Sequence, residues 1–291
     1  MAALPAACND AAVDPAVKPG ETLSGTPALW RADGPAGSIW LFGSIHALPD
    51  NVNWESPQLD RAIARSDRLV LEVLGLDDPA EIGKVFNRLG NSPGQPPLDE
   101  RIAPDLRDKA HALQEAGKIA DSRFATLESW AAAIALSNVS SSMAGVSSDN
   151  GVEQAVTAKF VDQDKPVFGL ETAAGQFAYF DGLPEADQRL MLSSVIADSD
   201  SATAMYREML DDWLAGDVPA IAEVTRAGML AQPDIRAAIL LARNRDWAAK
   251  VDAMARAGHN PLVVVGAAHL AGPGSVQDEL AQRGYTITRV Q

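Results

Sequence analysis

The chain is poor in residues that cross-link a fold, since its 291 residues include one cysteine, Cys8, and four histidines. A single cysteine excludes a disulfide within the chain and a metal cluster built from cysteines. Cysteine use therefore does not indicate the redox compartment in which the protein works. A metal site would need histidine and carboxylate ligands instead.

Positive charge is also scarce, because 24 lysines and arginines face 39 aspartates and glutamates, which gives a formal net charge of −15. Nucleic acids and anionic membrane surfaces bind proteins through clustered basic side chains. The excess of negative charge therefore argues against nucleic acids and anionic membranes as partners, and by itself it indicates no other partner. No apolar run reaches the roughly 20 residues of a membrane-spanning helix, so we expect no transmembrane segment.

Residues 1–27 are rich in alanine and proline and predict a flexible lead-in. They lack the basic stretch followed by an apolar stretch that marks a secretory signal. The same segment is compatible with a mature exported chain whose signal has been removed. We therefore expect a periplasmic or extracellular location, and a cytoplasmic one stays open.

Apolar runs near the beginning of the chain predict the first strands of a sheet. Residues 28–33 and 38–43 flank a Gly-Pro turn and predict a hairpin. A helical pattern over 56–67 separates the second run from a third, residues 68–73. This β–α–β order favours a parallel pair of strands.

Further apolar runs over 165–171 and 261–266 place strands in the middle and near the end of the chain. The fold class that follows is α/β, with a mixed, largely parallel sheet formed by both chain ends and a large helical insertion. We expect one domain over residues 28–291. Its helical lobe should comprise approximately residues 99–160 and 184–258.

The clearest strands end in, or lead directly to, an imidazole or a carboxylate, namely His46, Glu72, Glu171 and His269. Ligands of open α/β sheets bind outside the carboxyl ends of the strands. Two neutral imidazoles and a carboxylate are a common ligand set for a divalent metal with open positions. We predict that His46, Glu72 and His269 hold such a metal, and that Glu171 acts as a general base or supports the ligands.

A glycine precedes each of these histidines by three residues, Gly43 before His46 and Gly266 before His269. Without a Cβ, a glycine lets the backbone turn sharply and approach a bound group closely, so we place both glycines in the cofactor-binding site. A structural role is the alternative for either histidine alone. The alternative for Glu72, a costly charge in an apolar run, is a salt bridge to a neighbouring helix.

Arg243 and Asn244 lie in a helical pattern. Arg243 is a candidate to clamp a substrate carboxylate or phosphate, or to pair with Glu72 or Glu171. The alternative is a solvated helix face. With Glu72 and Glu171, these two residues complete the predicted catalytic group.

Several common catalytic motifs are absent, including H-E-x-x-H, G-x-S-x-G, G-x-x-x-x-G-K-[ST] and a G-x-G-x-x-G after a strand. Their absence argues against the usual zincin, serine-hydrolase, NTPase and Rossmann functions. The remaining histidines, His111 and His259, are predicted to be a surface residue and a structural residue. The serine-rich stretch 140–149 is a candidate lid.

Five blocks together resemble one family of proteins, the TraB/GumN family: "LWRADGPAGSIWLFGSIHALPD", "ADRLVLEV", "KPVFGLET", "LLARNRDWAAKV" and "PLVVVGAAHLAGPGSVQDELAQRGYTITRV". The resemblance covers about residues 28–291 and is greatest to the GumN-type bacterial branch. The family also includes the pheromone-shutdown TraB/PrgY proteins and the Tiki metalloproteases of animals. It implies a fold shared with erythromycin-esterase and ChaN-like proteins, some of which bind haem.

The paired G-x-x-H motifs of the family correspond to Gly43–His46 and Gly266–His269, and its strand-end glutamate corresponds to Glu72. In the Tiki branch these positions are linked to peptide cleavage that depends on a divalent metal, typically manganese or cobalt. The Arg-Asn helix of the family corresponds to Arg243 and Asn244. Related chains often carry an aspartate at the position of Glu153.

The leading hypothesis is therefore a hydrolase that depends on a divalent metal (Mn²⁺, Co²⁺ or Zn²⁺) and acts on a peptide or small-molecule substrate, first of all as a peptidase. One alternative is a non-catalytic cell-envelope protein that binds a peptide, haem or a glycan in the same crevice. Another is an accessory factor in exopolysaccharide production. The sequence does not indicate an oligomeric state.

Overall fold

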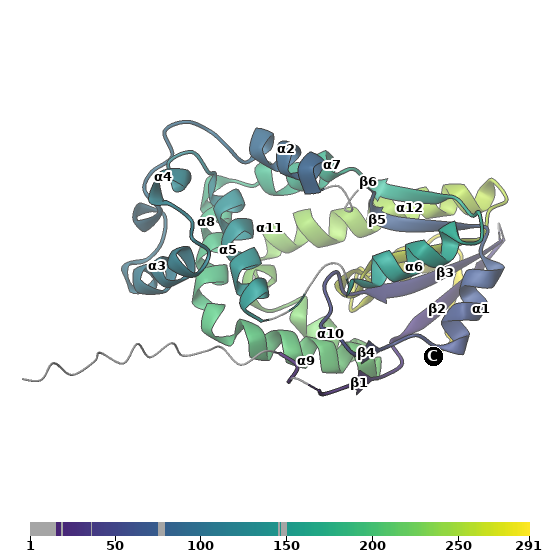
Figure 1. Ribbon diagram of the computed structural model, residues 1–291. Helices are drawn as coiled ribbons and strands as arrows, with labels where there is room; N and C mark the ends of the chain where they lie inside the picture. The colour runs from purple at the N-terminus through teal and green to yellow at the C-terminus, as the bar shows by residue number, and fades with distance from the viewer. Residues whose placement is uncertain (1–15, 19, 36, 75–78, 145, 147–149) are drawn as a thin grey trace, which may run out of the picture.

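The computed structural model describes residues 16–18, 20–35, 37–74, 79–144, 146 and 150–291, which form a sheet-based half and a helical half (Figure 1). In the sheet-based half, helices lie on both faces of one sheet, and in the other half helices pack on one another. The strands are β1 (Leu23–Ser24), β2 (Leu29–Gly34), β3 (Gly37–Ser44), β4 (Val52–Asn53), β5 (Arg68–Val73), β6 (Val167–Glu171), β7 (Pro261–Gly266) and β8 (Thr286–Arg289).

Helices account for most of the remaining regular structure. The α-helices are α1 (Pro57–Arg65), α2 (Pro79–Leu89), α3 (Arg107–Ala116), α4 (Asp121–Phe124), α5 (Ser129–Met143), α6 (Val152–Val161), α7 (Ala173–Asp181), α8 (Glu185–Ala197), α9 (Ala202–Ala215), α10 (Val218–Val224), α11 (Pro233–Arg236), α12 (Ala242–Arg256) and α13 (Val276–Ala281). Shorter 3₁₀ turns cover Leu98–Glu100, Pro104–Leu106, Ser199–Ser201, Gly228–Ala231 and Ala267–Leu270, and a π-helical turn covers Ala237–Leu241.

The main sheet has six strands in the order β6–β5–β7–β3–β2–β8. Its first four strands are parallel, whereas β2 is antiparallel to both β3 and β8. Strands from the beginning and the end of the chain alternate across it, because β7 lies between β5 and β3. The prediction of a mixed, largely parallel sheet built from both chain ends in an α/β fold is confirmed.

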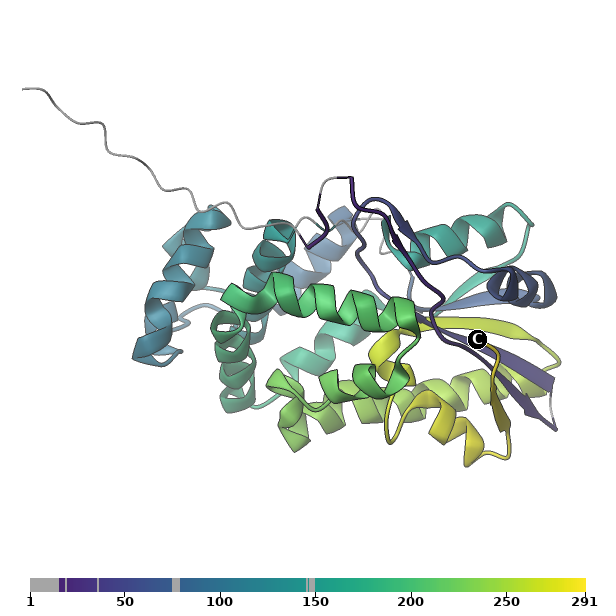
Figure 2. The ribbon, with the colours of Figure 1, turned by 90° about the horizontal axis from the view of Figure 1, so that it is seen from below.

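One face of the sheet packs against α1, α6 and α9. Successive side chains of a strand point to opposite faces, and Phe42 of β3 points to this one. Its ring stacks on Trp54 and meets the edge of Trp213 from α9. The indole N–H of Trp213 also donates to the carbonyl of Gly43 at 2.8 Å, so α9 is fixed beside the carboxyl end of β3. Figure 2 shows α9 running from the helical half to the sheet-based half.

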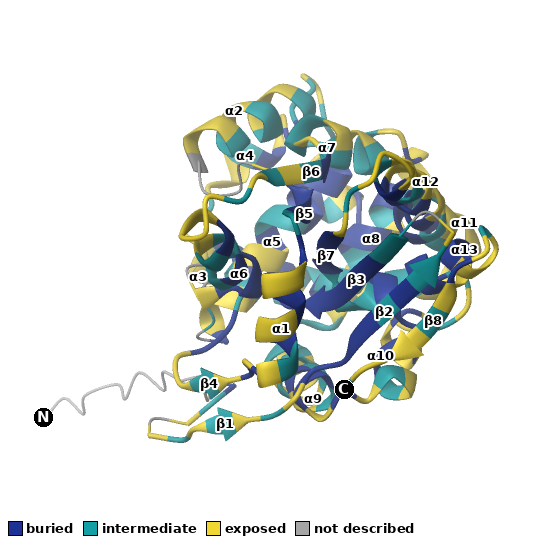
Figure 3. Ribbon diagram, turned by 90° about the vertical axis from the view of Figure 1, so that its right-hand side faces the viewer, coloured by how far each residue is buried: buried dark blue, intermediate teal, exposed yellow. Residues whose placement is uncertain are grey.

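The opposite face of the sheet is covered by α12 and α13. Leu41, Val70 and Val263 from the three central strands pack there against Trp247 of α12. Figure 3 shows these strands buried in the middle of the molecule. Burial on both faces explains why the central strands are continuous apolar runs rather than alternating ones.

A third apolar core lies in the helical half, between α3, α4, α5 and α8. Trp130 of α5 is fully buried there and stacks on Phe180. The segments predicted for the helical lobe, 99–160 and 184–258, divide between the two halves. Their helices α6 and α12 pack on the sheet instead of on the lobe.

Part of the predicted lead-in, 1–27, belongs to the fold. Leu23–Ser24 forms β1 and pairs with β4 in a separate two-stranded sheet. Ala16 is buried, and its N–H donates to the carbonyl of Ala144 at 3.1 Å. Residues 1–15, with Cys8, and residue 19 lie outside the described part of the chain.

The candidate lid, 140–149, begins within α5, because residues 140–143 are the last turn of that helix. Residues 145 and 147–149 are outside the described part. No helix within the described residues has the length and apolar character that crossing a membrane requires.

Candidate active site

A cavity of about 330 Å³ lies over the carboxyl ends of β3, β5 and β7. His46 follows β3, Glu72 lies in β5, His269 follows β7, and all three line the cavity together with Arg243 from α12. The order of the sheet explains this convergence, since the three parallel strands are adjacent and end at one edge. Residues from opposite ends of the chain thus meet at one site.

Gly266, the last residue of β7, lies at the centre of this group. A Cβ atom built on it would be 3.6 Å from Glu72 Oε2, 3.6 Å from His269 Cδ2 and 3.9 Å from His46 Nε2. The three side chains therefore face a single point, which is called the Gly266 point below. The backbone N–H of Gly266 donates to Glu72 Oε2 at 3.3 Å.

Gly43 has a different environment. A Cβ atom on this residue would be 3.0 Å from the Cα of Ala267, so the missing side chain lets β3 pack against the turn that follows β7. The carbonyl of Gly43 accepts the indole N–H of Trp213. Of the two predicted glycines, only Gly266 lines the cavity.

His46 is held by a carboxylate from α6. Its Nδ1 is 2.6 Å from Glu153 Oε1, and Glu153 also accepts the hydroxyl of Ser44 at 2.5 Å. Desolvation alone would lower the pKa of His46, but the hydrogen bond and the charges of Glu153 and Glu72 outweigh it and raise this pKa to about 9. The ring is thus cationic at neutral pH, and a metal that bound Nε2 would displace its second proton.

His269 is buried and neutral. Its Nδ1 is 2.6 Å from the amide oxygen of Asn244, and the amide nitrogen of Asn244 donates to the carbonyl of Gly274 at 2.7 Å. The second bond fixes which amide atom faces the ring, so Nδ1 carries the proton and Nε2 is a free acceptor. The negative charge of Glu72 would raise the pKa of His269, but burial outweighs it and lowers this pKa to about 3. The ring packs against Trp247, with 4.3 Å between centroids.

The side chains of Glu72 and Glu171 are both buried, and they share one guanidinium. Nη2 of Arg243 is 2.5 Å from Glu72 Oε1 and 2.8 Å from Glu171 Oε2, and its Nε is 3.0 Å from Glu171 Oε1. The amide of Gln176 donates to Glu72 Oε1 at 2.6 Å, and Trp247 donates to Glu171 at 2.7 Å. Burial would raise the pKa of Glu72, yet the charges of the imidazoles and of Arg243 lower it to about 2.

The salt bridge considered as an alternative role for Glu72 is therefore present, but it occupies only Oε1 and leaves Oε2 at the Gly266 point. Arg243 is buried, so the alternative of a solvated helix face is wrong for it. Glu171 borders a separate pocket on the other side of this ion pair and does not line the cavity. Asn244 reaches the cavity only through its bond to His269.

Among the residues that the structure describes, no three histidine, cysteine, aspartate or glutamate side chains form a group that could hold a metal ion as they are placed. The side chains at the Gly266 point nevertheless have the chemistry of ligands for a divalent cation, since they are two imidazole rings and one carboxylate. His46 faces the point with Nε2, Glu72 with Oε2 and His269 with the ring carbon Cδ2. Each imidazole also has its Nδ1 bonded to an outer oxygen atom, as metal-binding histidines do. Binding of an ion would require these side chains to move closer together.

Comparison with known proteins settles the family, because the model of the TraB/PrgY/gumN family matches residues 28–289. The chain belongs to the TraB/PrgY/gumN family. Similar relatives are the proteins named "Uncharacterized protein YbaP" of Escherichia coli (strain K12) and of Shigella flexneri. Each is 27% identical over 241 residues, which cover 82% of this chain and 86% of the relative. No solved structure matches the chain.

In this member of the TraB/PrgY/gumN family, the walls of the cavity are apolar. Met209 and Trp213 come from α9, and Ile221 and Val224 come from α10. The hydroxyl of Tyr206, also on α9, donates to the carbonyl of Ala47 at 2.7 Å. Helix α9 therefore both lines the cavity and holds the loop that carries His46.

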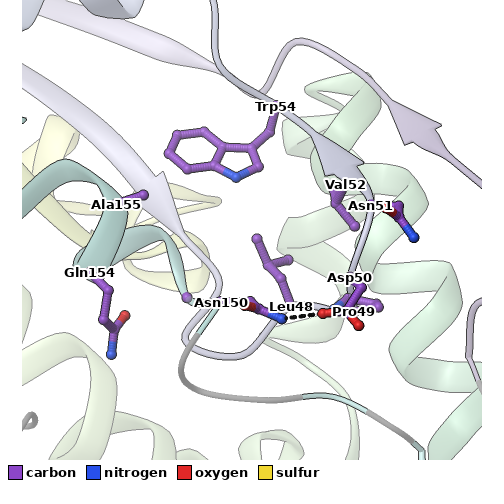
Figure 4. Close-up of a pocket in the computed structure, with 10 residues that line it drawn as sticks. Leu48, Pro49, Asp50, Asn51, Val52, Trp54, Asn150, Gln154 and Ala155 are labelled. Carbon is purple, nitrogen blue, oxygen red and sulfur yellow. Dashed lines mark hydrogen bonds between the residues drawn. The ribbon is translucent and has the colours of Figure 1, made fainter. Parts of the chain in front are cut away.

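A more open cavity of about 730 Å³ adjoins the same loop (Figure 4). Asp50 and Asn150 both line it and lie next to each other, and the amide of Asn150 donates to Asp50 at 2.7 Å. Trp54 forms part of its wall, but none of the predicted site residues lines it. The other two histidines lie elsewhere, as predicted. His111 is exposed beside Asp99, and His259 binds Asp67 and Arg68 near the amino end of β5.

Sequence reasoning predicted Asn244, which holds His269, as a site residue without giving it that role, and from the residues alone it missed Glu153, which holds His46. Glu153 was suggested only by the family resemblance. It lies next to Val152 in the first turn of a predicted helix and gave no distinct signal of its own, because acidic residues are common there. Tyr206 and Trp213 gave no signal, because their partners are backbone carbonyls far away in the sequence.

Proposed function

We propose that this chain is a divalent-metal-dependent hydrolase whose substrates are peptides. The observation that carries the proposal is the common orientation of His46 Nε2, the His269 ring and Glu72 Oε2 toward the Gly266 point. These are the donor types that bind Mn²⁺, Co²⁺ or Zn²⁺ in open catalytic sites. Membership of the TraB/PrgY/gumN family supports the proposal.

His46, Glu72 and His269 would hold the ion. When bound, such an ion lowers the pKa of a water molecule and polarises the carbonyl group of a substrate. The charge of the site favours a cation, because the carboxylates of Glu72, Glu153 and Glu171 surround it. Arg243 and the cationic His46 offset only part of that negative charge.

The surrounding residues orient the ligands. Glu153 and Asn244 each hold an imidazole by its Nδ1–H, so that Nε2 is the ring nitrogen left for an ion. In His269 this Nε2 is a free acceptor, whereas in His46 it would first lose its proton to the ion. Arg243 favours the ionised form of Glu72 and holds its Oε1. Oε2 accepts the backbone N–H of Gly266 at 3.3 Å and keeps a lone pair that could bind an ion. Glu171 supports Arg243. We assign it no proton transfer, because its oxygens are hydrogen-bonded to Arg243 and Trp247 outside the cavity.

The proposal is tested by metal binding and peptide cleavage measured together. We expect metal-free wild-type protein to bind about one Mn²⁺, Co²⁺ or Zn²⁺ ion per chain and to cleave members of a mixture of blocked peptides, with cleavage lost on chelation. His46→Ala and His269→Ala should remove both properties. His111→Ala is the matched control, because it removes an exposed histidine far from the cavity.

Equal metal content in the wild type and in both site variants would contradict the proposal. Cleavage that a chelator leaves unchanged would contradict its metal-dependent part. Peptide binding without cleavage in the metal-loaded wild type would favour the non-catalytic alternative.

A further inference from the structure

A second apolar hollow adjoins the candidate active site. This groove has a volume of about 320 Å³ and lies between α5 and α8 on one side and α9 and α10 on the other. Val224, the last residue of α10, lines both the groove and the active-site cavity. The two hollows are therefore neighbours that share a wall.

Helix α9 connects them along one of its faces. Met205 lines the groove, whereas Met209 and Trp213 line the cavity. Residues four apart lie above one another on a helix, so the three side chains form a continuous apolar row. Figure 2 shows α9 crossing between the halves in the direction that this row requires.

The wall of the groove formed by α9 and α10 is exposed although its large side chains are apolar. Met205 is 47% exposed and Val224 is 42% exposed, and both are among the large apolar side chains that the fold leaves uncovered. Single exposed apolar residues are ordinary, but a cluster beside a catalytic cavity indicates a binding surface. Continuity with the cavity indicates that the bound molecule is the substrate.

The opposite wall of the groove is partly polar. Ser137 and Ser140 of α5 and Ser194 of α8 line it, and Asp198 lies at the end of α8. The hydroxyls of Ser140 and Ser194 donate to Leu136 and Asp198, and their oxygens keep lone pairs that can accept the N–H groups of a polypeptide. A fatty acyl chain has no groups that would use them. The lining thus favours a peptide.

We propose that the groove and the cavity form one channel that binds an extended peptide segment with large apolar side chains. This assignment rests on the proposed function, since the bond to be cleaved is placed at the Gly266 point. From Ala202 to Trp213 the helix spans about 16 Å, the length of about five extended residues. The side chain next to that bond packs against Met209 and Trp213, and a more distant one packs against Met205 and Val224.

Photo-crosslinking tests the path of the peptide without depending on cleavage. The probe is a blocked tetrapeptide of three leucines and one benzoyl-phenylalanine, and the protein is the double variant His46→Ala/His269→Ala. We expect mass spectrometry to place the crosslinks on α9 and α10, at or beside Met205, Met209 and Val224. Crosslinks confined to other surfaces would overturn the proposal.

Affinity measurements on matched variants give the second test. Val224→Trp narrows the junction between groove and cavity and should weaken binding of the tetrapeptide by about tenfold or more. Val161→Trp is the control, because Val161 is also an exposed valine at the last position of a helix and lies outside both hollows. It should leave the affinity unchanged. Met205→Ser provides an independent loss of apolar contact should the tryptophan variant fold poorly.

The comparison ligands decide the chemical class. A tetrapeptide in which serines replace the leucines should bind at least about tenfold more weakly. If laurate competes fully with the leucine peptide and binds more tightly, the site is one for acyl chains and the proposal is overturned. Equal affinity of Val224→Trp and Val161→Trp for the leucine peptide would also overturn it. These binding measurements do not depend on cleavage. A failure of the proposed metal-dependent hydrolysis can therefore be told apart from a failure of the proposed peptide channel.

Discussion

Replacing Gly266 by alanine perturbs the site without removing any of its polar groups. The added methyl would lie 3.6 Å from Glu72 Oε2 and from His269 Cδ2, and 3.9 Å from His46 Nε2, which are ordinary van der Waals contacts. The backbone at this position, with φ −47° and ψ 133°, is one that alanine adopts. The fold should be retained, with a gain of about 0.4–1 kcal/mol from the lower entropy of the unfolded chain.

The same methyl should prevent cation binding. Metal ions bind nitrogen and oxygen ligands at about 2.0–2.2 Å, so an ion held by these side chains needs the space between them. Because the methyl would occupy that space, we expect the affinity for Mn²⁺ or Zn²⁺ to fall at least about 100-fold, or about 2.7 kcal/mol. Peptide cleavage should be lost in parallel.

Titration calorimetry on metal-free protein gives the affinity, and thermal unfolding without metal gives the stability. Gly83→Ala is the matched control, because Gly83 lies within α2 with no atom within 4 Å of its Cβ position. It should raise Tm slightly and leave metal binding unchanged. A folded Gly266→Ala protein with wild-type affinity for the metal would refute the placement of the ion at the Gly266 point.

Four further substitutions test the groups around the site. Asn244→Leu removes the acceptor for the imidazole Nδ1–H and should weaken metal binding about 10–100-fold, measured by calorimetry; unchanged affinity would contradict its orienting role. Arg243→Met leaves the carboxylates of Glu72 and Glu171 buried without their shared counter-charge. It should lower the free energy of unfolding, measured with denaturant, by about 3–5 kcal/mol. Adding Glu171→Gln to Arg243→Met should recover part of the lost stability, because it removes one of the two buried charges. No recovery would argue against the shared ion pair. Gly151 precedes α6 and lies against the loop that carries His46. In Gly151→Ala the added methyl would overlap the carbonyl of His46, so the free energy of unfolding should fall by about 1–3 kcal/mol. An unchanged Tm would show that this loop can move to make room without loss of stability.

The strand-end residues could be predicted because two simple rules act together at them. Continuous apolar runs identify strands buried on both faces, and adjacent parallel strands end at one edge of a sheet. His46, Glu72 and His269 follow from these rules, and the structure places them around one cavity. The order of the strands was not predictable in the same way, because it depends on packing between segments far apart in the chain.

The partners of these side chains were harder to predict. Arg243 had three open interpretations, and only the fold decides that it pairs with both Glu72 and Glu171. The sequence of a helix does not indicate which strand end the helix will face. For the same reason the row of Met205 and Met209 on α9 gave no indication of a groove.

The serine-rich stretch 140–149 overlaps a helical pattern over residues 128–143 that the sequence itself predicts. Serine is a weak helix former, so its clustering made a loop from residue 140 a competing interpretation. In the fold, α5 continues to Met143 because its length packs beside α8 and α9. Ser140 takes part in this helix by bonding back to the carbonyl of Leu136, a local bond that serine makes within helices.

The central claim is that one divalent ion binds where His46, Glu72 and His269 converge. Anomalous diffraction from crystals soaked in Mn²⁺ or Zn²⁺, recorded on each side of the absorption edge of the metal, tests it most directly. The account predicts one strong peak within bonding distance of Nε2 of both imidazoles and of Glu72 Oε2. Fully loaded crystals with no peak there, or with peaks only at other carboxylates, would contradict it.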